Sequence, residues 1–414
     1  MTESMKDGLP SNIVKTVTTA IDNANEELRN INLQIWNNPE VMFEEFKAAD
    51  LLSSWFESKS WTVKRGVYGI ETAFEARFSV KEGGRTVCYN AEYDALPGIG
   101  HACGHNLIAT STLASAIGVA AVMQEKQIPG TLVVMGTPAE ETGGGKWIMA
   151  NRGAWKDCDV CLMTHGMSSF STPLFISKAS WKFRAKFHGK GSHAAGAPWD
   201  GRNACDAIVH AYNGLALLRQ HIGKDESIQG VILEAGKAPN VIPDYAEGSY
   251  SIRAKNSKGL YALKERIVPI FEGAAAATGC TVEVFWDALY EDVLSNRTLA
   301  ERYRSYMLTE LGLAAEDMIS IDESLVKHAQ NGSSDHGNCT YITPGIQALF
   351  SIKAEDMPHT PAFCEAAGKD FGHAEALRAG KANALIGLEV MLNDAFYQSV
   401  RVEWESSMKE AGRL

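Results

Sequence analysis

Short apolar segments alternate with helical segments through the first part of this chain. Strand-like apolar runs occupy about residues 86–89, 131–135 and 160–163, and helical patterns occupy about residues 107–124 and a stretch from about Lys146. Strand, helix and strand at this spacing are typical of crossover connections between parallel strands. The sequence therefore predicts an α/β domain, with a mainly parallel sheet flanked by helices.

Helical patterns also precede this alternation. Apolar residues recur at helical spacing from Ile13 to Ile35, which predicts one long amphipathic helix with Ser11 as its N-cap. A second helix is predicted from Phe46 to Trp55. These helices add to the layers that flank the sheet.

The pattern changes near residue 177. Residues 181–188 alternate apolar and polar side chains as a half-buried strand does, and three further strand-like runs cover about residues 230–234, 248–253 and 281–286. Helical patterns occupy about residues 202–221 and 258–278. This arrangement predicts a small α+β layer of the ferredoxin-like kind, with two helices on one face of its sheet.

The helix and loop pattern of the first part resumes at about Asp292 and ends in a helix over about residues 374–391. An inserted domain is the simplest account of this return. We therefore expect a discontinuous domain formed by residues 1–176 and 292–414, and an inserted domain formed by residues 177–291. Two domains also suit a chain of 414 residues.

Charge and cysteine usage restrict the class of protein. The formal charge is 39 − 50 = −11, which argues against a nucleic-acid or anionic-membrane partner. The eight cysteines are not spaced as a disulfide framework, and neither an apolar signal core nor a membrane-length apolar run is visible. We expect a soluble, cytoplasmic protein.

Three of the predicted strands end in side chains that bind metals. The first leads into His101-Ala-Cys103-Gly-His105, the second into Glu140-Glu141, and the third into His165. The carboxyl ends of parallel strands meet at one edge of a sheet, where α/β proteins build their sites. Each group also has an ordinary interpretation, as a buried thiol with hydrogen-bonded histidines, a solvated acidic turn or a structural histidine.

These residue types together suit metal-assisted hydrolysis. Zinc accepts thiolate, imidazole and carboxylate ligands, and adjacent glutamates point in different directions. One carboxylate can then bind metal while its neighbour moves a proton to and from water. The pair Cys158-Asp-Val-Cys161 resembles a redox motif, but Cys161 falls within a predicted buried strand, so core packing is expected there.

Seven segments in order resemble one known family, the aminoacylase-like binuclear metallopeptidases and amidohydrolases. They are Asp94-Ala-Leu-Pro, His101-Ala-Cys-Gly-His105, Pro138-Ala-Glu-Glu141, His165-Gly, Gly191-Ser-His193-Ala-Ala-Gly-Ala-Pro198, Asn240-Val-Ile-Pro243 and His359-Thr-Pro-Ala-Phe363. Two more, His101 to Asn106 and Gly332-Ser-Ser-Asp335-His-Gly-Asn338, look most like the p-aminobenzoyl-glutamate hydrolase and Xaa-Arg dipeptidase branch.

The resemblance implies a role for each matching residue of the catalytic domain. The implied metal ligands, for two divalent ions that are zinc or manganese, are Cys103, His105, Glu141, His165 and His359. Glu140 falls on the carboxylate that acts as general base and acid toward metal-activated water. Asp94 matches an aspartate that supports the metal site.

In the inserted domain the resemblance implies that His193 polarises the substrate carbonyl, in its own or a partner's site. Asn240 and Arg253 would hold the substrate carboxylate, and the domain would form a homodimer. Each also has an ordinary interpretation, as a polar turn for His193, a turn residue for Asn240 and a solvated strand end for Arg253.

Two positions depart from the common family pattern. Asn106 stands where relatives commonly have Asp, and Ser334-Asp335-His336 stands where they often show Glu-Asp-Phe. The departure at Asn106 puts in doubt any substrate preference carried over from the aminoacyl branch. We assign no role to His336 from the sequence.

The sequence thus predicts a metal-dependent hydrolase of an amide bond in a dipeptide or an N-acyl amino acid. Two alternatives stay open. The same site would also suit amide-bond formation or hydrolytic deamination of an aromatic amine, and a non-catalytic metal-binding scaffold would share its ligands. The intact Glu140 favours the hydrolase.

Overall fold

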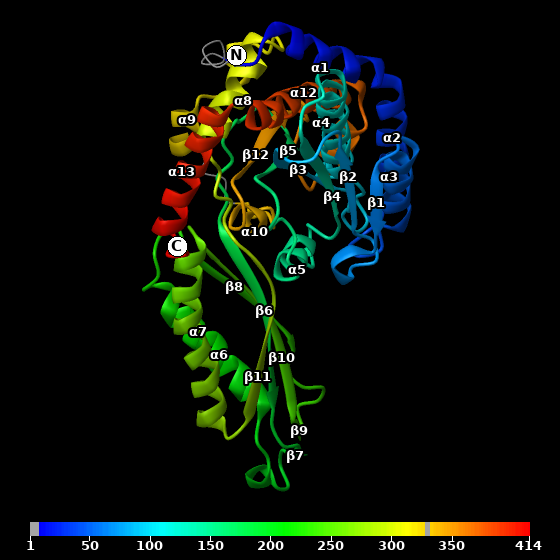
Figure 1. The fold of residues 1–414 in the computed structure, drawn as a ribbon. Coiled ribbons are helices and arrows are strands. Elements are labelled where there is room, and N and C mark those ends of the chain that lie inside the picture. Colours follow the sequence, from blue (N-terminus) through cyan, green and yellow to red (C-terminus); the bar gives the residue numbers. More distant parts are fainter. Residues whose placement is uncertain (1–7, 328–331) are drawn as a thin grey trace. The chain divides into compact units, whose positions relative to one another are not determined.

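The computed structural model describes residues 8–327 and 332–414, and the chain forms two compact units. The first unit comprises Met1–Ile176 and Val293–Leu414, and the second comprises Ser177–Asp292 (Figure 1). Each unit has its own sheet and its own helices.

The first unit is built on a six-stranded sheet of order β1-β2-β4-β3-β5-β12. The pairs β4 with β3, β3 with β5 and β5 with β12 are parallel, whereas β1 and β2 run antiparallel at one edge. This confirms the predicted mainly parallel sheet. The strands are β1 (Thr62–Arg65), β2 (Phe74–Ser79), β3 (Arg85–Glu92), β4 (Gly130–Thr137), β5 (Val160–Met167) and β12 (Gly345–Ser351).

Alternate residues of these strands enter two different cores, one on each face of the sheet. Val87, Tyr89 and Leu132 pack with residues of α1, α4 and α12, whereas Cys88 and Val133 pack with residues near α5 and α10. Figure 1 shows α4 and α12 on one side of the strands and α5 and α10 on the other. The helices of this unit are α1 (Ser11–Asn23), α2 (Asn25–Asn37), α3 (Phe46–Ser58), α4 (His105–Lys126), α5 (Gly145–Asn151), α8 (Arg297–Thr309), α9 (Ile321–Lys327), α10 (Gly337–Thr340), α11 (Pro361–Ala367), α12 (Asp370–Leu392) and α13 (Asp394–Glu410).

The prediction of one long N-terminal helix from the apolar spacing is wrong, because this segment forms two helices. The break falls at Ala24, which has φ −91° and ψ 0° between α1 and α2. Asn23 and Asn25 flank it, and short amide side chains favour helix ends over helix interiors. Ser11 is the first helical residue rather than the N-cap, which is Pro10.

Helix α4 is the central helix of the first unit. Within the described ranges it is the one helix long and apolar enough to cross a membrane by length and composition, but 83% of its apolar window is buried inside the protein. It packs against β3, β5 and α12. Its apolar character is therefore that of a core helix.

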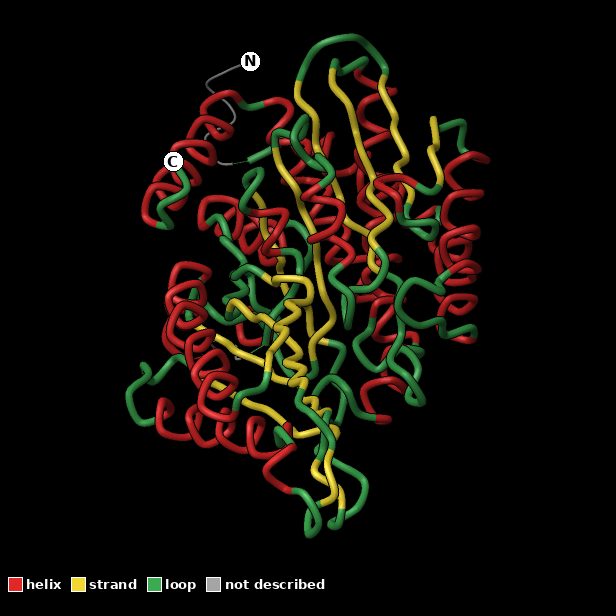
Figure 2. The backbone as a smooth tube through the Cα atoms, turned by 90° about the horizontal axis from the view of Figure 1, so that it is seen from below, coloured by secondary structure: helices red, strands yellow, loops and turns green. Residues whose placement is uncertain are grey.

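The second unit has a four-stranded antiparallel sheet of order β11-β6-β10-β8. Its chain order is β6 (Ala179–His188), α6 (Ala204–Arg219), β8 (Ser227–Glu234), β10 (Tyr245–Ala254), α7 (Ser257–Thr278) and β11 (Thr281–Tyr290). Strand, helix, two strands, helix and strand in this sheet order are the ferredoxin-like arrangement. In Figure 2 the two helices lie to one side of the strands, and Phe183, Tyr250 and Phe271 pack between the layers.

Candidate metal centre

Four of the side chains predicted to bind metal lie at the carboxyl ends of β3, β4 and β5, which are neighbours in the parallel part of the sheet. Cys103 and His105 follow β3, Glu141 follows β4, and His165 lies near the end of β5. The fifth, His359, lies between β12 and α11. His105 is the first residue of α4, and Gly104 before it has φ 77°, a conformation that glycine adopts without strain. This tight turn lets Cys103 and the first turn of α4 share one edge of the sheet.

The five predicted ligand residues lie together. In one group the ligand atoms of Cys103, His105 and His165 lie within 4.8 Å of one another, and in another those of Cys103, Glu141 and His359 do. Cys103 Sγ lies 3.6 Å from His165 Nε2, and His359 Nε2 lies 3.4 Å from Glu141 Oε2. Two overlapping groups with a shared thiol suit two neighbouring cations.

Neighbouring groups fix the rings of two histidines. His105 Nδ1 lies 2.9 Å from Asp94 Oδ1, and His165 Nδ1 lies 2.6 Å from the carbonyl oxygen of Gly166. Each contact suits a proton on Nδ1 and leaves Nε2 for a metal. Asp94 also accepts the backbone N–H of Glu141 at 2.9 Å, so one carboxylate orients two of the predicted ligands.

Two buried atoms of this group have no hydrogen-bond partner among the described residues. They are His105 Nε2 and Glu141 Oε1, which lie 3.9 Å apart. A buried polar atom without a partner is costly, and a divalent cation between these atoms would satisfy both. Thiol, imidazole and carboxylate together form a donor set that fits zinc and similar ions.

Glu140 lies beside the ligands with its side chain directed into the same region. Its carboxylate belongs to a group with Glu92 and His105 whose ligand atoms lie within 4.8 Å of one another. Burial, together with the charges of Glu92 and Glu141, raises the pKa of Glu140 well above its ordinary value. A carboxyl group with a raised pKa can carry a proton at neutral pH.

The backbone that carries Glu140 is held from a distant segment. Ala139 has a φ of 60°, in the left-handed region, and it donates its N–H to Glu45 Oε1 at 3.0 Å. The fully buried Glu45 carboxylate also accepts the N–H of Phe43 at 3.0 Å and the hydroxyl of Thr72 at 2.9 Å. Glu45 thus stabilises the turn between β4 and the two glutamates.

Asn106, the departure from the common family pattern, has a packing role in the structure. Its amide nitrogen donates to Asn32 Oδ1 at 2.7 Å and to the carbonyl of Ala367 at 2.9 Å. Both partners are acceptors, so an Asp carboxylate would face two oxygens. Asn106 therefore ties α4 to α2 and to the end of α11.

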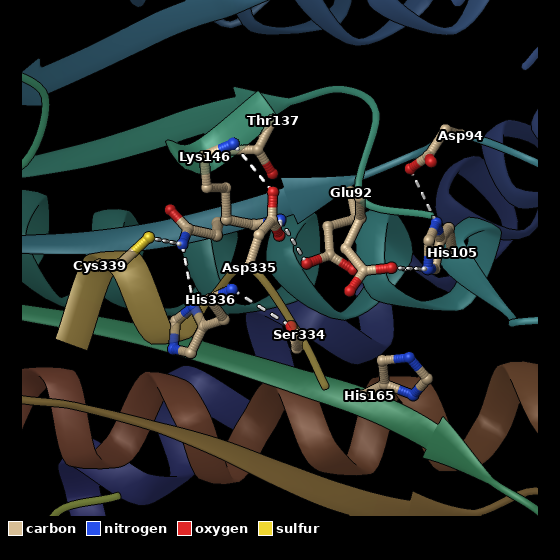
Figure 3. Close-up of polar contacts among 12 residues, drawn as sticks. Glu92, Asp94, His105, Thr137, Lys146, His165, Ser334, Asp335, His336 and Cys339 are labelled. Atoms are coloured by element: carbon tan, nitrogen blue, oxygen red, sulfur yellow. Dashed lines mark hydrogen bonds and ion pairs between the residues drawn. The ribbon is translucent and has the colours of Figure 1, made fainter. Parts of the chain in front are cut away.

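Three buried charged residues beside this site were given no role in the sequence analysis: Glu92, Lys146 and Asp335 (Figure 3). All three are fully buried, and the Lys146 ammonium lies 2.7 Å from Glu92 Oε1 and 2.5 Å from Asp335 Oδ1. Two signals were available. Glu92 stands two residues before Asp94, and Lys146 follows the acidic pair directly after Gly143-Gly-Gly145.

A second group of potential ligands, Cys161, His336 and Cys339, lies elsewhere in the same unit and is fully buried. His336 Nδ1 lies 3.1 Å from Asn90 Nδ2, and its Nε2 lies 3.1 Å from the carbonyl oxygen of Ile346. Both ring nitrogens therefore have partners. Cys161 packs in the core.

His101, the first residue of the Cys-His loop, belongs to neither ligand group that contains Cys103. It is 1% exposed, and burial lowers its pKa to about 4. It is a neutral, buried ring.

The three predicted residues of the inserted domain lie in the second unit. His193 in β7 (Ser192–His193) pairs with Val241 in β9 (Val241–Ile242), and the N–H of Ala194 donates to the carbonyl of Asn240 at 3.0 Å. His193 and Asn240 are therefore exposed neighbours beside the two-stranded pairing of β7 and β9. Arg253 lies half-buried near the end of β10, paired with Ser180 and Ser227, and burial lowers its pKa.

Comparison with known proteins places these features in context. The family model of the peptidase dimerisation domain matches residues 176–278, which make up most of the second unit. A Xaa-Arg dipeptidase of Mus musculus is 38% identical over 402 residues, covering 94% of this chain and 91% of that protein. A p-aminobenzoyl-glutamate hydrolase subunit of Escherichia coli (strain K12) is 36% identical over 310 residues, covering 69% of this chain and 63% of that protein.

Solved structures share the fold. A dinuclear metal binding peptidase of the M20 family from Bacillus subtilis aligns with a TM-score of 0.63 and 21% identity, over 89% of this chain and 99% of that one. An aminobenzoyl-glutamate utilization protein from Klebsiella pneumoniae aligns with a TM-score of 0.69 and 17% identity, over 90% of this chain and 98% of that one.

Proposed function

This chain belongs to the M20 family of metal-dependent peptidases and amidohydrolases, and we propose that it is a dipeptidase whose preferred substrates carry a C-terminal basic residue. The observation that carries the proposal is that the five predicted metal ligands lie together beside the buried Glu140. The substrate class is supported by 38% identity over 94% of the chain to a Xaa-Arg dipeptidase.

In this proposal two divalent cations, zinc or manganese, are held by Cys103, His105, Glu141, His165 and His359. Asp94 orients His105 and the backbone of Glu141 through the contacts at 2.9 Å. When bound, such cations supply Lewis acidity that activates water and polarises the amide carbonyl.

Glu140 moves the proton. Its carboxylate form accepts a proton from the attacking water, and the resulting carboxyl group donates that proton to the leaving amine nitrogen as the amide bond breaks. Burial favours the protonated form, because it raises the pKa of Glu140 well above its ordinary value. The adjacent Glu141 is directed to the ligand group, so the two carboxylates have separate tasks.

The second unit supplies the remaining roles and the dimer. His193 stabilises the developing oxyanion, and Asn240 and Arg253 hold the substrate carboxylate. The edge strand β8 leaves Val231 58% and Leu233 53% exposed, and an exposed apolar edge strand is suited to pair with a second copy of the chain. We propose a homodimer through this unit, at work in the cytoplasm, where its eight free cysteines stay reduced.

A second candidate is hydrolysis of an N-acyl amino acid, since the chain is 36% identical to a p-aminobenzoyl-glutamate hydrolase subunit. Turnover of the metal-loaded protein on Xaa-Arg and Xaa-Lys dipeptides, neutral dipeptides, p-aminobenzoyl-glutamate and N-acetyl amino acids separates the two. We expect kcat/KM for the basic dipeptides to exceed the others by about tenfold or more.

The same experiment tests the other uses of the site. Synthesis from the free amino acid components, or ammonia release from aromatic amines, in place of hydrolysis would identify a condensing enzyme or a deaminase. Absence of turnover on the whole panel by metal-loaded protein would contradict the hydrolase and favour a binding scaffold.

A further inference from the structure

Lys146 is a fully buried lysine whose ammonium lies between two fully buried carboxylates. The Lys146 Nζ atom contacts Glu92 and Asp335, and the backbone N–H of Lys146 donates to Asp335 Oδ2 at 2.9 Å. Asp335 therefore binds both the side chain and the backbone at the start of α5. Figure 3 shows these groups close together beside His105.

A buried ion cluster of this kind is a poor means of stabilising a fold. Removing three charges from water is costly, and replacing buried ion pairs by apolar side chains is often neutral or stabilising. The position of the cluster suggests another task. Lys146 joins the end of β3, the start of α5 and the segment before α10, and Glu140 lies among these segments.

The Glu92 carboxylate connects this cluster to the metal centre. Its Oε1 atom lies 2.7 Å from Lys146, whereas its Oε2 atom lies 3.5 Å from His105 Nε2. His105 Nε2 is the ring nitrogen that Asp94 leaves for a metal. A Glu92 side chain that changed its rotamer would therefore change the surroundings of a predicted ligand and of Glu140.

We infer that Lys146 is a positioning residue of the metal centre. Its ammonium holds Glu92 beside His105, and together with Asp335 it fixes the start of α5, which follows the Glu140–Glu141 turn in the chain. The inference rests on the proposed function, because it assigns Lys146 to that site. If the inference holds, Lys146 and Asp335 affect metal affinity and turnover, although neither belongs to the ligand groups that contain Cys103.

The electrostatics of the cluster agree with this geometry. Burial opposes a charge on Lys146, but the Asp335 and Glu92 carboxylates raise the pKa of Lys146 well above its ordinary value. Lys146 and Glu92 are thus held as an ion pair.

The test compares Lys146→Met and Asp335→Asn with the wild type. Binding of Mn²⁺ to metal-free protein is measured by calorimetry, and the kcat and KM for a cleaved substrate are measured at saturating Mn²⁺. We expect Lys146→Met to weaken Mn²⁺ binding and to lower kcat by about 10- to 100-fold each, with KM changed less than about threefold. Asp335→Asn should change both in the same direction by a smaller factor, because Lys146 and Glu92 stay paired.

Arg302→Met is the matched control. It removes a cation from another buried carboxylate, since Arg302 Nη2 lies 3.3 Å from the fully buried Glu389. We expect this control to lower the midpoint of thermal unfolding while Mn²⁺ affinity and kcat stay at wild-type values. The inference is overturned if Lys146→Met and Asp335→Asn behave like Arg302→Met, with thermal stability the only quantity that falls.

The same measurements also cover two other cases: a Lys146→Met variant that does not fold, and a wild type without turnover. If Lys146→Met does not fold, the Mn²⁺ affinity and kcat of Asp335→Asn decide whether the inference stands. If the wild type cleaves no substrate of the panel, the proposed function fails, while Mn²⁺ binding and the visible spectrum of the Co²⁺-loaded variants still test Lys146 as a positioning residue.

Discussion

Two groups of cysteine and histidine in the first unit each bring their ligand atoms within 4.8 Å of one another, and they differ in what surrounds them. Cys103, His105 and His165 form one, and Cys161, His336 and Cys339 form the other. Both have members on β5, His165 toward its carboxyl end and Cys161 near its amino end. Spacing of ligand atoms alone therefore does not identify a metal centre.

The hydrogen bonds of the rings distinguish them. His105 Nε2 has no hydrogen-bond partner among the described residues, whereas both nitrogens of His336 have one. The hydrogen-bond network of His336 extends through Asn90 to Trp155, because Trp155 Nε1 donates to Asn90 Oδ1 at 3.0 Å. A closed set of hydrogen bonds holds segments together, and an open one leaves atoms for a ligand.

Glu140→Gln should have the largest effect on turnover, because it removes the proton carrier beside the Cys103 group and keeps the side-chain volume. We expect kcat to fall about a thousandfold while the metal content stays at the wild-type level. Elemental analysis and turnover of the same preparation measure both quantities.

Glu389→Gln is the control for this change, since Glu389 is also fully buried but lies against Tyr306 and Arg302. It should retain wild-type turnover. Near-normal activity of Glu140→Gln would contradict its assignment as the proton carrier.

Paired cysteine substitutions compare the two groups directly. Cys103→Ala removes a thiol shared by both predicted cation positions, so we expect metal affinity to fall by about 10- to 100-fold. Cys161→Ala should leave metal affinity unchanged and lower the free energy of unfolding by about 1 kcal/mol, as other small core deletions do. Metal titration and denaturant unfolding of both variants separate these outcomes, and a loss of metal from Cys161→Ala would reverse the interpretation of the second group.

Substitution of one histidine from each region, His336 and His359, separates stability from metal content in the same way. His336→Ala removes a buried ring and its contacts with the Asn90 amide and the Ile346 carbonyl, and Asn90 keeps only its contact with Cys339 from the same nitrogen. We therefore expect a loss of about 3 kcal/mol in the free energy of unfolding with metal content unchanged. His359, whose side chain is 55% exposed, lies 3.4 Å from Glu141. His359→Ala should lower metal content with little change in stability, and equal stability losses in the two variants would remove the contrast.

Local pattern and segment order sufficed to predict the parallel sheet and the edge at which its site lies. Crossover connections impose parallel strands, and parallel strands bring Cys103, Glu141 and His165 to one edge whatever the details of packing. The break at Ala24 was not predictable from apolar spacing. The buried faces of α1 and α2 stay in phase across it, so the periodicity does not register the kink.

The Lys146 cluster shows what sequence cannot supply. Glu92, Lys146 and Asp335 lie on three separate segments, and their ion pairs exist only because the sheet brings those segments together. The same holds for His336, whose partners Asn90 and Ile346 belong to different strands. Whether a buried polar atom is satisfied depends on tertiary contacts, and that property separates the two Cys-His groups.

Glu45 extends the comparison to pH. Burial, with the Asp94 charge adding to it, raises the pKa of Glu45 to about 7 from 4.5. Burial lowers the pKa of His336 to about 4, so that ring stays neutral from pH 5 to 8. Between about pH 4.5 and 7 the folded protein therefore holds a proton on Glu45 that the unfolded chain releases, and the stability it contributes is lost as the pH rises through 7.

Glu45→Gln isolates this effect, because its amide oxygen can still accept the N–H groups of Phe43 and Ala139. In denaturant unfolding of the metal-free proteins we expect the variant to gain up to about 3 kcal/mol relative to the wild type between pH 5 and pH 8. Other titrating groups are common to both proteins and cancel in the difference. Parallel pH curves would mean that Glu45 is already ionised in the folded protein at pH 5, and its carboxylate would then hold the Ala139 turn as an anion.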